Sequence, residues 1–316
     1  MSGVPILSIV LPAFGEASHI RSSLQAIHAR AAALGVPFEL VVVDDGSLDG
    51  TWSELKRLAA EIAELRAVSL ARNFGKEGAI RAGLEVARGD AVVLMDCDLQ
   101  HPPELIPEMF RLWRQEGYHV VNAVKEDRGS ETLILGFCAR TFYRLFERLS
   151  GIELAGASDF KLLDRAVVDI LRDLPERNFF FRGLVPWIGF RQAAVPFRVA
   201  PRAAGESGWS LARRTYLAIN AIVSFSAWPL QFVTALGFLF LAFSVVLGAQ
   251  TFYAKLSGGA VEGFTTVILV LVFMGSILML SLGIIGQYLA KIYHELKQRP
   301  RYLVKEQIRV NLAPRD

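Results

Sequence analysis

A chain of 316 residues, 53% of them hydrophobic, is longer than one typical domain and more apolar than most soluble proteins. Its net charge of +3 favours no partner by itself, and two cysteines, Cys97 and Cys138, are too few for a disulfide framework, which fits a reducing cytosol. The apolar residues concentrate after about residue 215, which predicts a soluble N-terminal domain and a membrane-bound C-terminal part. No signal peptide is expected, because no basic segment precedes the first strand.

Short apolar segments alternate with helical patterns over the first 125 residues. We expect strands at residues 7–11, 39–43, 67–70, 91–95 and 119–123, with helices at 18–34, 52–63, 77–87 and 104–115. This alternation predicts a largely parallel sheet with helices on both faces. In such sheets, ligands bind beyond the carboxyl ends of the strands.

The fourth strand ends in Asp96-Cys97-Asp98-Leu99-Gln100. Alternate residues of an extended chain point to the same side, so Asp96 and Asp98 can converge. Two carboxylates that close are unfavourable without a cation between them, and oxygen ligands suit a hard ion such as Mg²⁺ or Mn²⁺, with Gln100 adding a carbonyl oxygen. Taken alone, so short a pattern is more often a solvated acidic turn.

Three further polar turns, at residues 12–16, 44–47 and 72–76, also follow predicted strands and should gather at the same edge of the sheet. No G-x-G-x-x-G follows the first strand, and the chain has no G-x-x-x-x-G-K-[ST], which argues against a dinucleotide-dependent oxidoreductase and a P-loop NTPase. Carboxylates can accept hydrogen bonds from ribose hydroxyls or base N–H groups, and a metal can bridge a diphosphate. The edge therefore suits a nucleoside diphosphate that carries another group.

Four motifs resemble the inverting family-2 glycosyltransferases with a GT-A fold: Leu11-Pro12-Ala13-Phe14-Gly15-Glu16, Val43-Asp44-Asp45-Gly46-Ser47, Arg72-Asn73-Phe74-Gly75-Lys76 and Asp96-Cys97-Asp98-Leu99-Gln100-His101-Pro102-Pro103-Glu104. More narrowly, the chain is similar to the dolichyl-phosphate mannosyltransferase and bacterial polyisoprenyl-phosphate glucosyltransferase group over essentially its whole length. The implied fold is a GT-A, Rossmann-like, mostly parallel α/β sheet, followed by an interfacial helix and two transmembrane helices. Gly15 departs from the usual Asn, and Cys97 from the commoner Ala.

The resemblance also implies roles for single residues. The residues implied to line the nucleotide pocket, or to lie near it, are Pro12, Glu16, Asp44, Asp45 and Lys76. Those implied to hold Mg²⁺ or Mn²⁺ on the diphosphate are Asp96, Asp98 and Gln100. We expect Asp98 and Asp159 to be the catalytic carboxylates, with Asp159 the acid closest to the acceptor, although a lone Asp there can also cap a helix. Asp164 fits helix capping better, and the role of Arg182 stays open.

The middle of the chain carries candidate phosphate ligands. Arg128 and Arg202 are candidates to hold an acceptor phosphate by charge-assisted bonds. Residues 202–209 resemble a family segment that closes over donor and acceptor phosphates; Arg202 and Ser207 match it, whereas Gly208 stands where lysine is common. The alternative is a plain linker. Residues 131–149 read as an arginine-rich amphipathic helix, or as a solvated basic face.

Two segments without a charged residue, 229–253 and 264–290, exceed the roughly 20 residues that span a bilayer, and 210–225 reads as an interfacial helix. We expect a catalytic domain at 1–209, a juxtamembrane helix at 210–228, a transmembrane hairpin at 229–290 and a cytoplasmic tail at 291–316. Basic residues flank the hairpin outside its loop and predict that both termini are cytoplasmic: Arg213, Arg214, Lys291, Lys297, Arg299, Arg301 and Lys305. Glycines in the spans would allow close helix packing, including between subunits.

These features predict transfer of a sugar from a nucleotide-sugar to a polyisoprenyl phosphate at the cytoplasmic face of a bacterial inner membrane. Segment 72–76 looks most like the glucosyltransferases and favours UDP-glucose; GDP-mannose and a UDP-pentose stay open. The acceptor phosphate has a second pKa of about 6, so a strong general base is unnecessary and Asp159 can orient the attack. A processive synthase is disfavoured, because Gln192 does not begin Gln-x-x-Arg-Trp and two spans form no channel. The intact acid pair speaks against a non-catalytic binding protein, and no nucleic-acid partner is expected.

Overall fold

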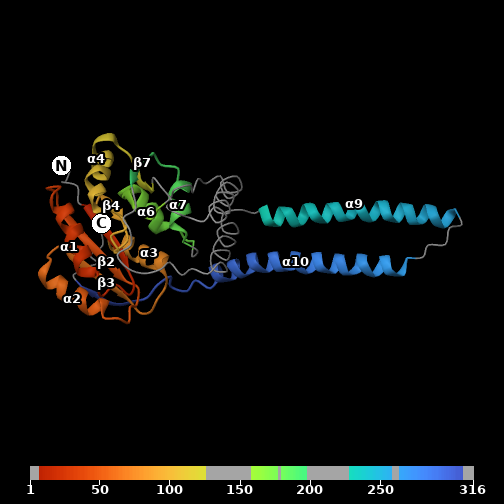
Figure 1. Ribbon diagram of the computed structural model, residues 1–316, viewed down its shortest axis with the longest axis horizontal. Helices are drawn as coiled ribbons and strands as arrows, with labels where there is room; N and C mark the ends of the chain where they lie inside the picture. Colours follow the sequence, from red (N-terminus) through yellow and green to blue (C-terminus); the bar gives the residue numbers. More distant parts are fainter. Residues whose placement is uncertain (1–6, 126–157, 177–178, 198–227, 258–262, 309–316) are drawn as a thin grey trace. The chain divides into compact units, whose positions relative to one another are not determined.

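A computed structural model describes residues 7–125, 158–176, 179–197, 228–257 and 263–308. The chain forms two compact units, one of residues 1–208 with 299–316 and the other of residues 209–298 (Figure 1). The predicted helices at 131–149 and 210–225 lie outside the described residues, as do Arg128, Arg202 and Ser207.

The larger unit is built on a mostly parallel sheet. Its strands are β1 (Leu7–Ala13), β2 (Phe38–Asp44), β3 (Leu65–Leu70), β4 (Ala91–Leu94), β5 (Val120–Lys125), β6 (Lys161–Asp164), β7 (Gln192–Phe197) and β8 (Val304–Ile308). They lie in the order β7-β5-β6-β4-β1-β2-β3-β8, and β6 and β8 run antiparallel to their neighbours. The five predicted strands are confirmed with ends shifted by at most two residues; β6, β7 and β8 were not expected.

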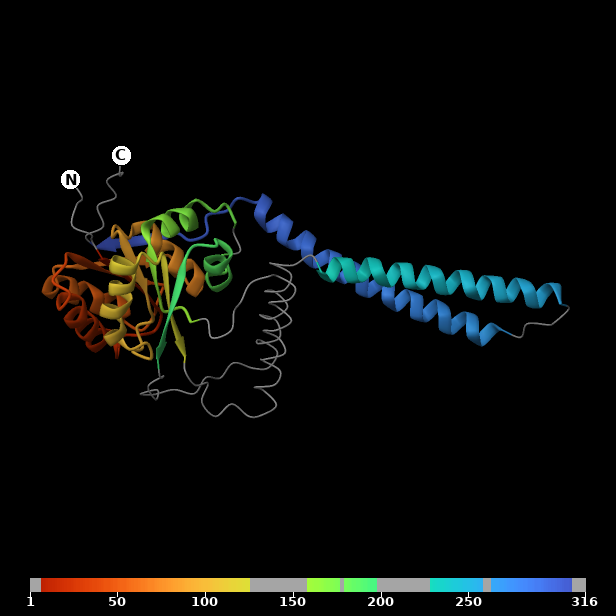
Figure 2. The same cartoon turned by 90° about the horizontal axis from the view of Figure 1, so that it is seen from above.

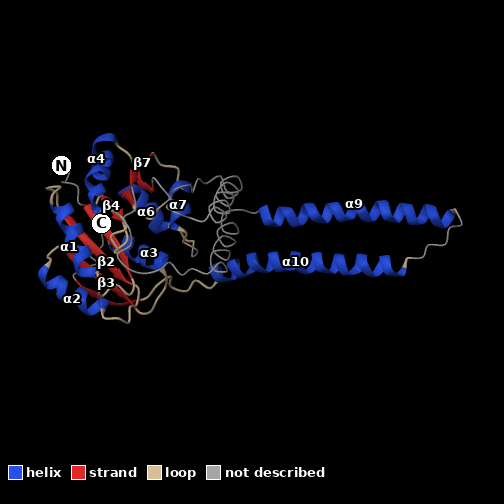
Figure 3. Ribbon diagram, in the orientation of Figure 1, coloured by secondary structure: helices blue, strands red, loops and turns tan. Residues whose placement is uncertain are grey.

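Helices join and cover the strands, as Figure 3 shows. They are α1 (Ile20–Ala32), α2 (Thr51–Glu61), α3 (Lys76–Val86), a short 3₁₀ turn η1 (Pro103–Leu105) that leads into α4 (Ile106–Glu116), α6 (Arg165–Asp173) and α7 (Phe181–Trp187). The four predicted helices are confirmed with shorter or shifted ends. Helix α4 is followed by Gly117, which has a φ of +68°. A glycine in this conformation commonly ends a helix. Asp164 caps α6 as predicted by accepting the Ala166 N–H at 2.9 Å.

The two faces of the sheet are buried by different helices. Leu7, Ile9 and Leu11 of β1 belong to the core that α1, α2 and α4 complete on one face. Val10 points to the other face, where α3 packs so closely that a Cβ on Gly83 would lie 2.3 Å from Val10 Cγ1. This burial on both faces explains why the central strands are almost wholly apolar and leaves the strand ends to carry polar groups.

The C-terminal segment returns to this sheet, which the sequence did not reveal. Strand β8 pairs with β3 so that Ile308 lies opposite Ala67, at the sheet edge visible in Figure 2. Glu306 accepts the Trp52 indole N–H at 2.7 Å and pairs with Lys56 at 2.6 Å. The Tyr302 hydroxyl hydrogen-bonds to Glu85. Part of the predicted tail is thus an edge strand of the larger unit.

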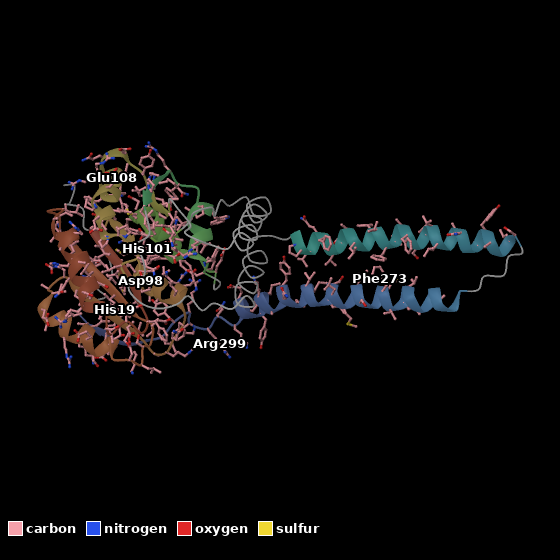
Figure 4. The ribbon with its side chains drawn as sticks, in the orientation of Figure 1. His19, Asp98, His101, Glu108, Phe273 and Arg299 are labelled. Atoms are coloured by element: carbon pink, nitrogen blue, oxygen red, sulfur yellow. The ribbon has the colours of Figure 1, made fainter. Side chains whose placement is uncertain are left out.

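The smaller unit contains two long helices, α9 (Trp228–Leu256) and α10 (Phe264–Leu296). They lie side by side, with the rings of Phe240 and Phe273 5.4 Å apart; Phe273 is labelled in Figure 4. Pro229–Ala254 and Val270–Tyr293 are long and apolar enough to cross a membrane. Their apolar side chains are largely exposed, as at Phe238 with 68%. Such exposure is unfavourable in water and is consistent with membrane association.

Candidate active site

Loops from five strands meet at one edge of the sheet. The turns after β1, β2, β3 and β4 lie at this edge because these strands are parallel. Strand β6 is antiparallel to β4 and pairs Lys161 with Leu94, so the residues before β6 lie beside those after β4. Asp159 therefore reaches the same edge as Asp96, although the two are far apart in the sequence. The predicted convergence of the four turns is confirmed, and β6 adds a fifth segment.

The turn after β2 is held by two buried carboxylates. Asp45, 3% exposed, accepts the N–H groups of Phe74 at 2.7 Å and Gly75 at 2.8 Å. Asp44, 1% exposed, accepts the Ser47 N–H at 3.1 Å and the Ser69 hydroxyl at 3.2 Å. Burial raises the pKa of Asp45, against the effect of its two N–H donors. These contacts fix the turns after β2 and β3 to each other, so both predicted pocket acids support the edge from within.

Gly46 brings these two turns into close contact. Its φ is +72°, and a Cβ there would lie 2.5 Å from the Arg72 carbonyl carbon and 2.8 Å from the Asn73 nitrogen. Only a residue without a side chain permits backbone atoms to approach in this way. The Arg72 guanidinium lies over the Phe74 ring at 4.2 Å, which further orders the turn after β3.

The turn after β1 is tied to the turn after β2 and faces the acid pair. The Gly15 N–H donates to Ser47 Oγ, and the Glu16 N–H donates to Thr51 Oγ1, both at 3.0 Å. Burial raises the pKa of the Glu16 carboxyl, and the charges of Asp98 and Asp96 raise it further. The Glu16 carboxyl therefore lies close enough to Asp96 and Asp98 for their charges to repel its own. Pro12 contributes its carbonyl oxygen, which accepts the Cys97 thiol at 3.5 Å.

The turn after β4 carries the predicted metal ligands. The Asp96 N–H donates to His101 Nδ1 at 3.1 Å, and the buried His101 ring stacks on Phe160 at 5.2 Å. Burial lowers the pKa of His101, and its Nδ1 acts as an acceptor in this contact. Asp98 is exposed, and its Oδ1 accepts the Gln100 N–H at 3.0 Å. Figure 4 labels Asp98 and His101 in this region.

Two cations and two carboxylates form a cluster beside this turn. Lys76 Nζ lies 2.5 Å from Asp96 Oδ1 and 2.6 Å from Asp159 Oδ2. Arg182 donates to both oxygens of Asp159, at 2.6 Å from Nε and 2.8 Å from a terminal nitrogen. Burial alone would raise the pKa of Asp159, which is 5% exposed, but Arg182 and Lys76 hold this pKa well below its usual range. Asp159 is therefore a carboxylate that binds protons weakly.

The oxygen atoms of the turn after β4 fit a divalent cation that arrives with a diphosphate. Among the described residues, no group of three or more His, Cys, Asp or Glu side chains forms a ready metal cluster. Mg²⁺ sites commonly use one or two carboxylates and complete their shell with water and substrate phosphates. Asp96, Asp98 and the Gln100 amide supply such hard donors, and the mutual repulsion felt at Glu16 shows a surplus of negative charge. Lys76 balances part of that charge at Asp96.

Sequence reasoning gave no role to several residues at this site. Arg182 stands among phenylalanines, and only the fold reveals that it binds Asp159. Glu77, next to Lys76, accepts the Phe181 N–H at 3.1 Å. Lys161 donates to Asn122 Oδ1 at 2.5 Å, and burial lowers its pKa to about 8. Arg182 and Lys161 are charged residues within apolar segments, and this pattern can mark a buried ion pair. It does not show which group each residue binds.

The family model and the curated relatives agree on one family. The model described as Glycosyl transferase family 2 matches residues 8–168. A glycosyltransferase of Synechocystis sp. is 37% identical over 95% of both chains. The SfII prophage-derived bactoprenol glucosyl transferase of Shigella flexneri is 35% identical over 96% of this chain and 99% of its own. The solved mannosyltransferase of Pyrobaculum calidifontis, in complex with GDP-Man and Mn²⁺, is 20% identical over 92% of this chain and 85% of its own, with a TM-score of 0.49.

Proposed function

Because the chain belongs to glycosyl transferase family 2, we propose that it transfers glucose from UDP-glucose to a polyisoprenyl phosphate at a membrane surface. One observation carries this proposal. The sheet edge combines an acid pair, the half-buried Asp96 and the exposed Asp98, with the cation-bound carboxylate of Asp159, in a chain that also has two helices long and apolar enough to cross a membrane. The near full-length similarity to a protein named bactoprenol glucosyl transferase supports glucose and a polyisoprenyl acceptor.

The donor end of the site uses the turns after β1 and β4. Asp96, Asp98 and Gln100 would hold Mg²⁺ or Mn²⁺, with Pro12 and Glu16 on the other side of the nucleotide pocket. When bound, such an ion acts as a Lewis acid that offsets the charge of the departing diphosphate. Asp44 and Asp45 keep the surrounding loops in place through their backbone contacts. Lys76, held between Asp96 and Asp159, places a positive charge at the same point.

The acceptor end requires orientation more than proton removal. An acceptor phosphate oxygen forms a bond to the sugar carbon while the bond from that carbon to the diphosphate breaks. Since the second pKa of a phosphate monoester is about 6, the attacking oxygen carries no proton at neutral pH. Asp159, fixed by Arg182 and Lys76, orients this attack. We propose that Arg128 and Arg202 hold the acceptor phosphate, and that the segment with Arg202 and Ser207 closes over the donor and acceptor phosphates. All three residues lie outside the described residues.

The membrane arrangement is also a proposal. The chain would pass the bacterial inner membrane twice through α9 and α10, with the catalytic unit and both termini in the cytoplasm. Basic residues after α10, including Lys297, Arg299 and Lys305, support this orientation. The glycines of both helices would permit close packing between copies of the chain. We propose a catalytic domain at 1–209, a juxtamembrane helix at 210–228, a transmembrane hairpin at 229–290 and a tail at 291–316. Strand β8 is the part of the tail that joins the sheet.

A radiolabel transfer assay tests the function. The full chain in detergent is given a polyisoprenyl phosphate, Mn²⁺ and labelled UDP-glucose, GDP-mannose or a UDP-pentose in separate reactions. We expect label in the lipid fraction with UDP-glucose, none after removal of divalent ions with EDTA, and recovery when Mn²⁺ is restored. Label from another donor alone would correct the sugar. Donor binding without transfer from any of them would support a non-catalytic binding protein and overturn the proposal.

A further inference from the structure

Glu77 links two helices next to the charged cluster. It lies in the first turn of α3, one residue after Lys76. Its Oε2 accepts the Phe181 N–H at 3.1 Å, at the first residue of α7. Phe180, which precedes this helix, provides no side-chain hydrogen bond to the helix start. A carboxylate from α3 thus supplies the acceptor that the first turn of α7 lacks.

The residue after this contact is Arg182, whose guanidinium binds both oxygens of Asp159. The position of the α7 backbone at residue 181 therefore sets where the Arg182 side chain starts. Lys76 binds the same Asp159 from α3. The two cations that hold Asp159 come from two helices, and the contact between Glu77 and Phe181 is a direct bond between these helices at this level.

We propose that Glu77 is a positioning residue for the transfer reaction: its carboxylate fixes the backbone beside Arg182 and so keeps Arg182 and Lys76 aligned on Asp159. This inference rests on the proposed function, because Asp159 matters only if the chain transfers a sugar. Glu77 itself need not touch donor or acceptor. Its ionised form is the better acceptor for the Phe181 N–H, since charged acceptors form the stronger hydrogen bonds.

The surroundings of Glu77 make this contact sensitive to pH. Burial raises the pKa of Glu77 to about 7; the Phe181 N–H opposes this rise, as do Arg182 and Lys76, while Asp159 adds to it. Within the described part of the chain, these groups face Glu77 from α7, from α3 and from the segment before β6. A carboxyl whose pKa is raised in the folded state stabilises the fold below its unfolded pKa of 4.5, and this stability is lost as the pH rises through 7. Ionised Glu77 therefore costs folding stability while it strengthens the contact to α7.

The experiment compares the full-length wild type with Glu77→Gln, Glu77→Ala and the control Glu108→Gln in the lipid-transfer assay. Glu108 is a half-buried carboxylate of α4, labelled in Figure 4, that pairs with Arg111 at 2.8 Å. For Glu77→Ala we expect kcat at pH 8 to fall at least tenfold, with KM for the nucleotide-sugar changed less than threefold. The control should match the wild type. The ratio of wild-type to Glu77→Gln kcat should rise with pH through about 7, because only the wild type gains a charge there; the titration of the acceptor phosphate cancels in this ratio.

If Glu77→Ala fails to fold, the Tm of Glu77→Gln provides a second test. Glu77→Gln should have a higher Tm than the wild type at pH 8 and nearly the same Tm at pH 4, below the unfolded pKa, because the amide never ionises. A kcat ratio that stays flat between pH 6 and 8.5 overturns the inference, and so does a Glu77→Ala enzyme that is folded and within twofold of wild type. A failure of the proposed function would instead appear as absence of transfer by the wild type from every donor.

Discussion

The turns after β2 and β4 look alike in sequence but differ in what their acids do. Each follows a buried apolar strand and carries two aspartates. In the first, Asp44 and Asp45 are buried and accept mainly backbone N–H groups. In the second, Asp98 is exposed and Asp96 pairs with the Lys76 ammonium. Backbone donors hold a carboxylate in place, whereas a flexible lysine can give way to a ligand. We therefore propose that the first turn supports the site and that the second binds the ligand.

The two turns also differ in how they reach the left-handed region of φ. The turn after β2 uses Gly46, with φ +72°, for which this conformation carries no strain. The turn after β4 uses Leu99, with φ +55°, where a side chain costs about 1 kcal/mol. Leu99 stands between Asp98 and Gln100, so the strain falls on the proposed metal turn. Strained residues of this kind are concentrated at functional sites.

The largest expected effect is that of Asp98→Ala. We expect kcat to fall by about 10³-fold, on the order of 4 kcal/mol in the barrier, because the exposed carboxylate that we propose to hold the metal is lost. The Tm should hardly change, since the hydrogen bond that Asp98 accepts is from its own turn. Transfer kinetics and a thermal melt on the same sample check both points. The control is Asp169→Ala, which removes a half-buried acid of α6 that lies outside the turn after β4. An active Asp98→Ala enzyme would remove the contrast between the two turns.

Gly46→Ala should chiefly reduce stability, by about 2–4 kcal/mol, because the new Cβ meets backbone atoms that cannot move aside and adds strain at positive φ. Gly35→Ala is the control: Gly35 has φ +65°, but nothing lies within 4 Å of its Cβ position, so only about 1 kcal/mol of strain is expected. Thermal unfolding of the two variants in detergent measures the difference. Equal losses of stability would mean that the contact with Arg72 and Asn73 is not what the glycine serves.

The central strands could be predicted because burial on both faces demands long apolar runs. The edge strands could not. Strand β8 reads Val-Lys-Glu-Gln-Ile, and its mostly exposed residues resemble a solvated tail. Strand β7 contains Pro196, which argues against a strand except at a sheet edge, where β7 lies. Strand β6 lies inside the sheet, between β5 and β4, but it is short and reads Lys-Leu-Leu-Asp, so charged residues at both ends hide its apolar pattern.

The site was predictable in place but not in its pairings. The rule for parallel sheets located the turns, and the resemblance to the family identified Asp96, Asp98 and Asp159. The partners of Asp159, however, are Lys76, 83 positions away, and Arg182, 23 positions away. These pairs depend on the antiparallel entry of β6 and on the placement of α7, which no local pattern specifies. The same reason concealed Glu77, whose partner lies 104 positions further on.

Asp159→Asn should have a smaller effect than Asp98→Ala. We expect kcat to fall about 10- to 100-fold, since the amide retains an oxygen for Arg182 but loses the charge that holds both cations. Asp159 has its pKa held well below the usual range, so it is ionised throughout the working pH range, and its replacement should remove no limb of the pH profile between pH 5 and 9. The measurement is kcat against pH for both enzymes. Loss of activity as complete as in Asp98→Ala, with Mn²⁺ binding intact, would indicate a true general base.

Leu99→Gly should also have a small net effect on stability. Relief of strain, about 1 kcal/mol, should nearly offset the loss of the partial packing of Leu99 against the core, so the net change should stay within about 1 kcal/mol. We expect kcat to fall although the free energy of unfolding hardly changes, because glycine loosens the backbone between Asp98 and Gln100. Comparing the Mn²⁺ affinity of this variant with that of the wild type separates the two contributions. If stability rises while affinity is unchanged, the strain at Leu99 outweighs its packing but plays no part in metal binding, and the turn after β4 is no more strained for function than the turn after β2.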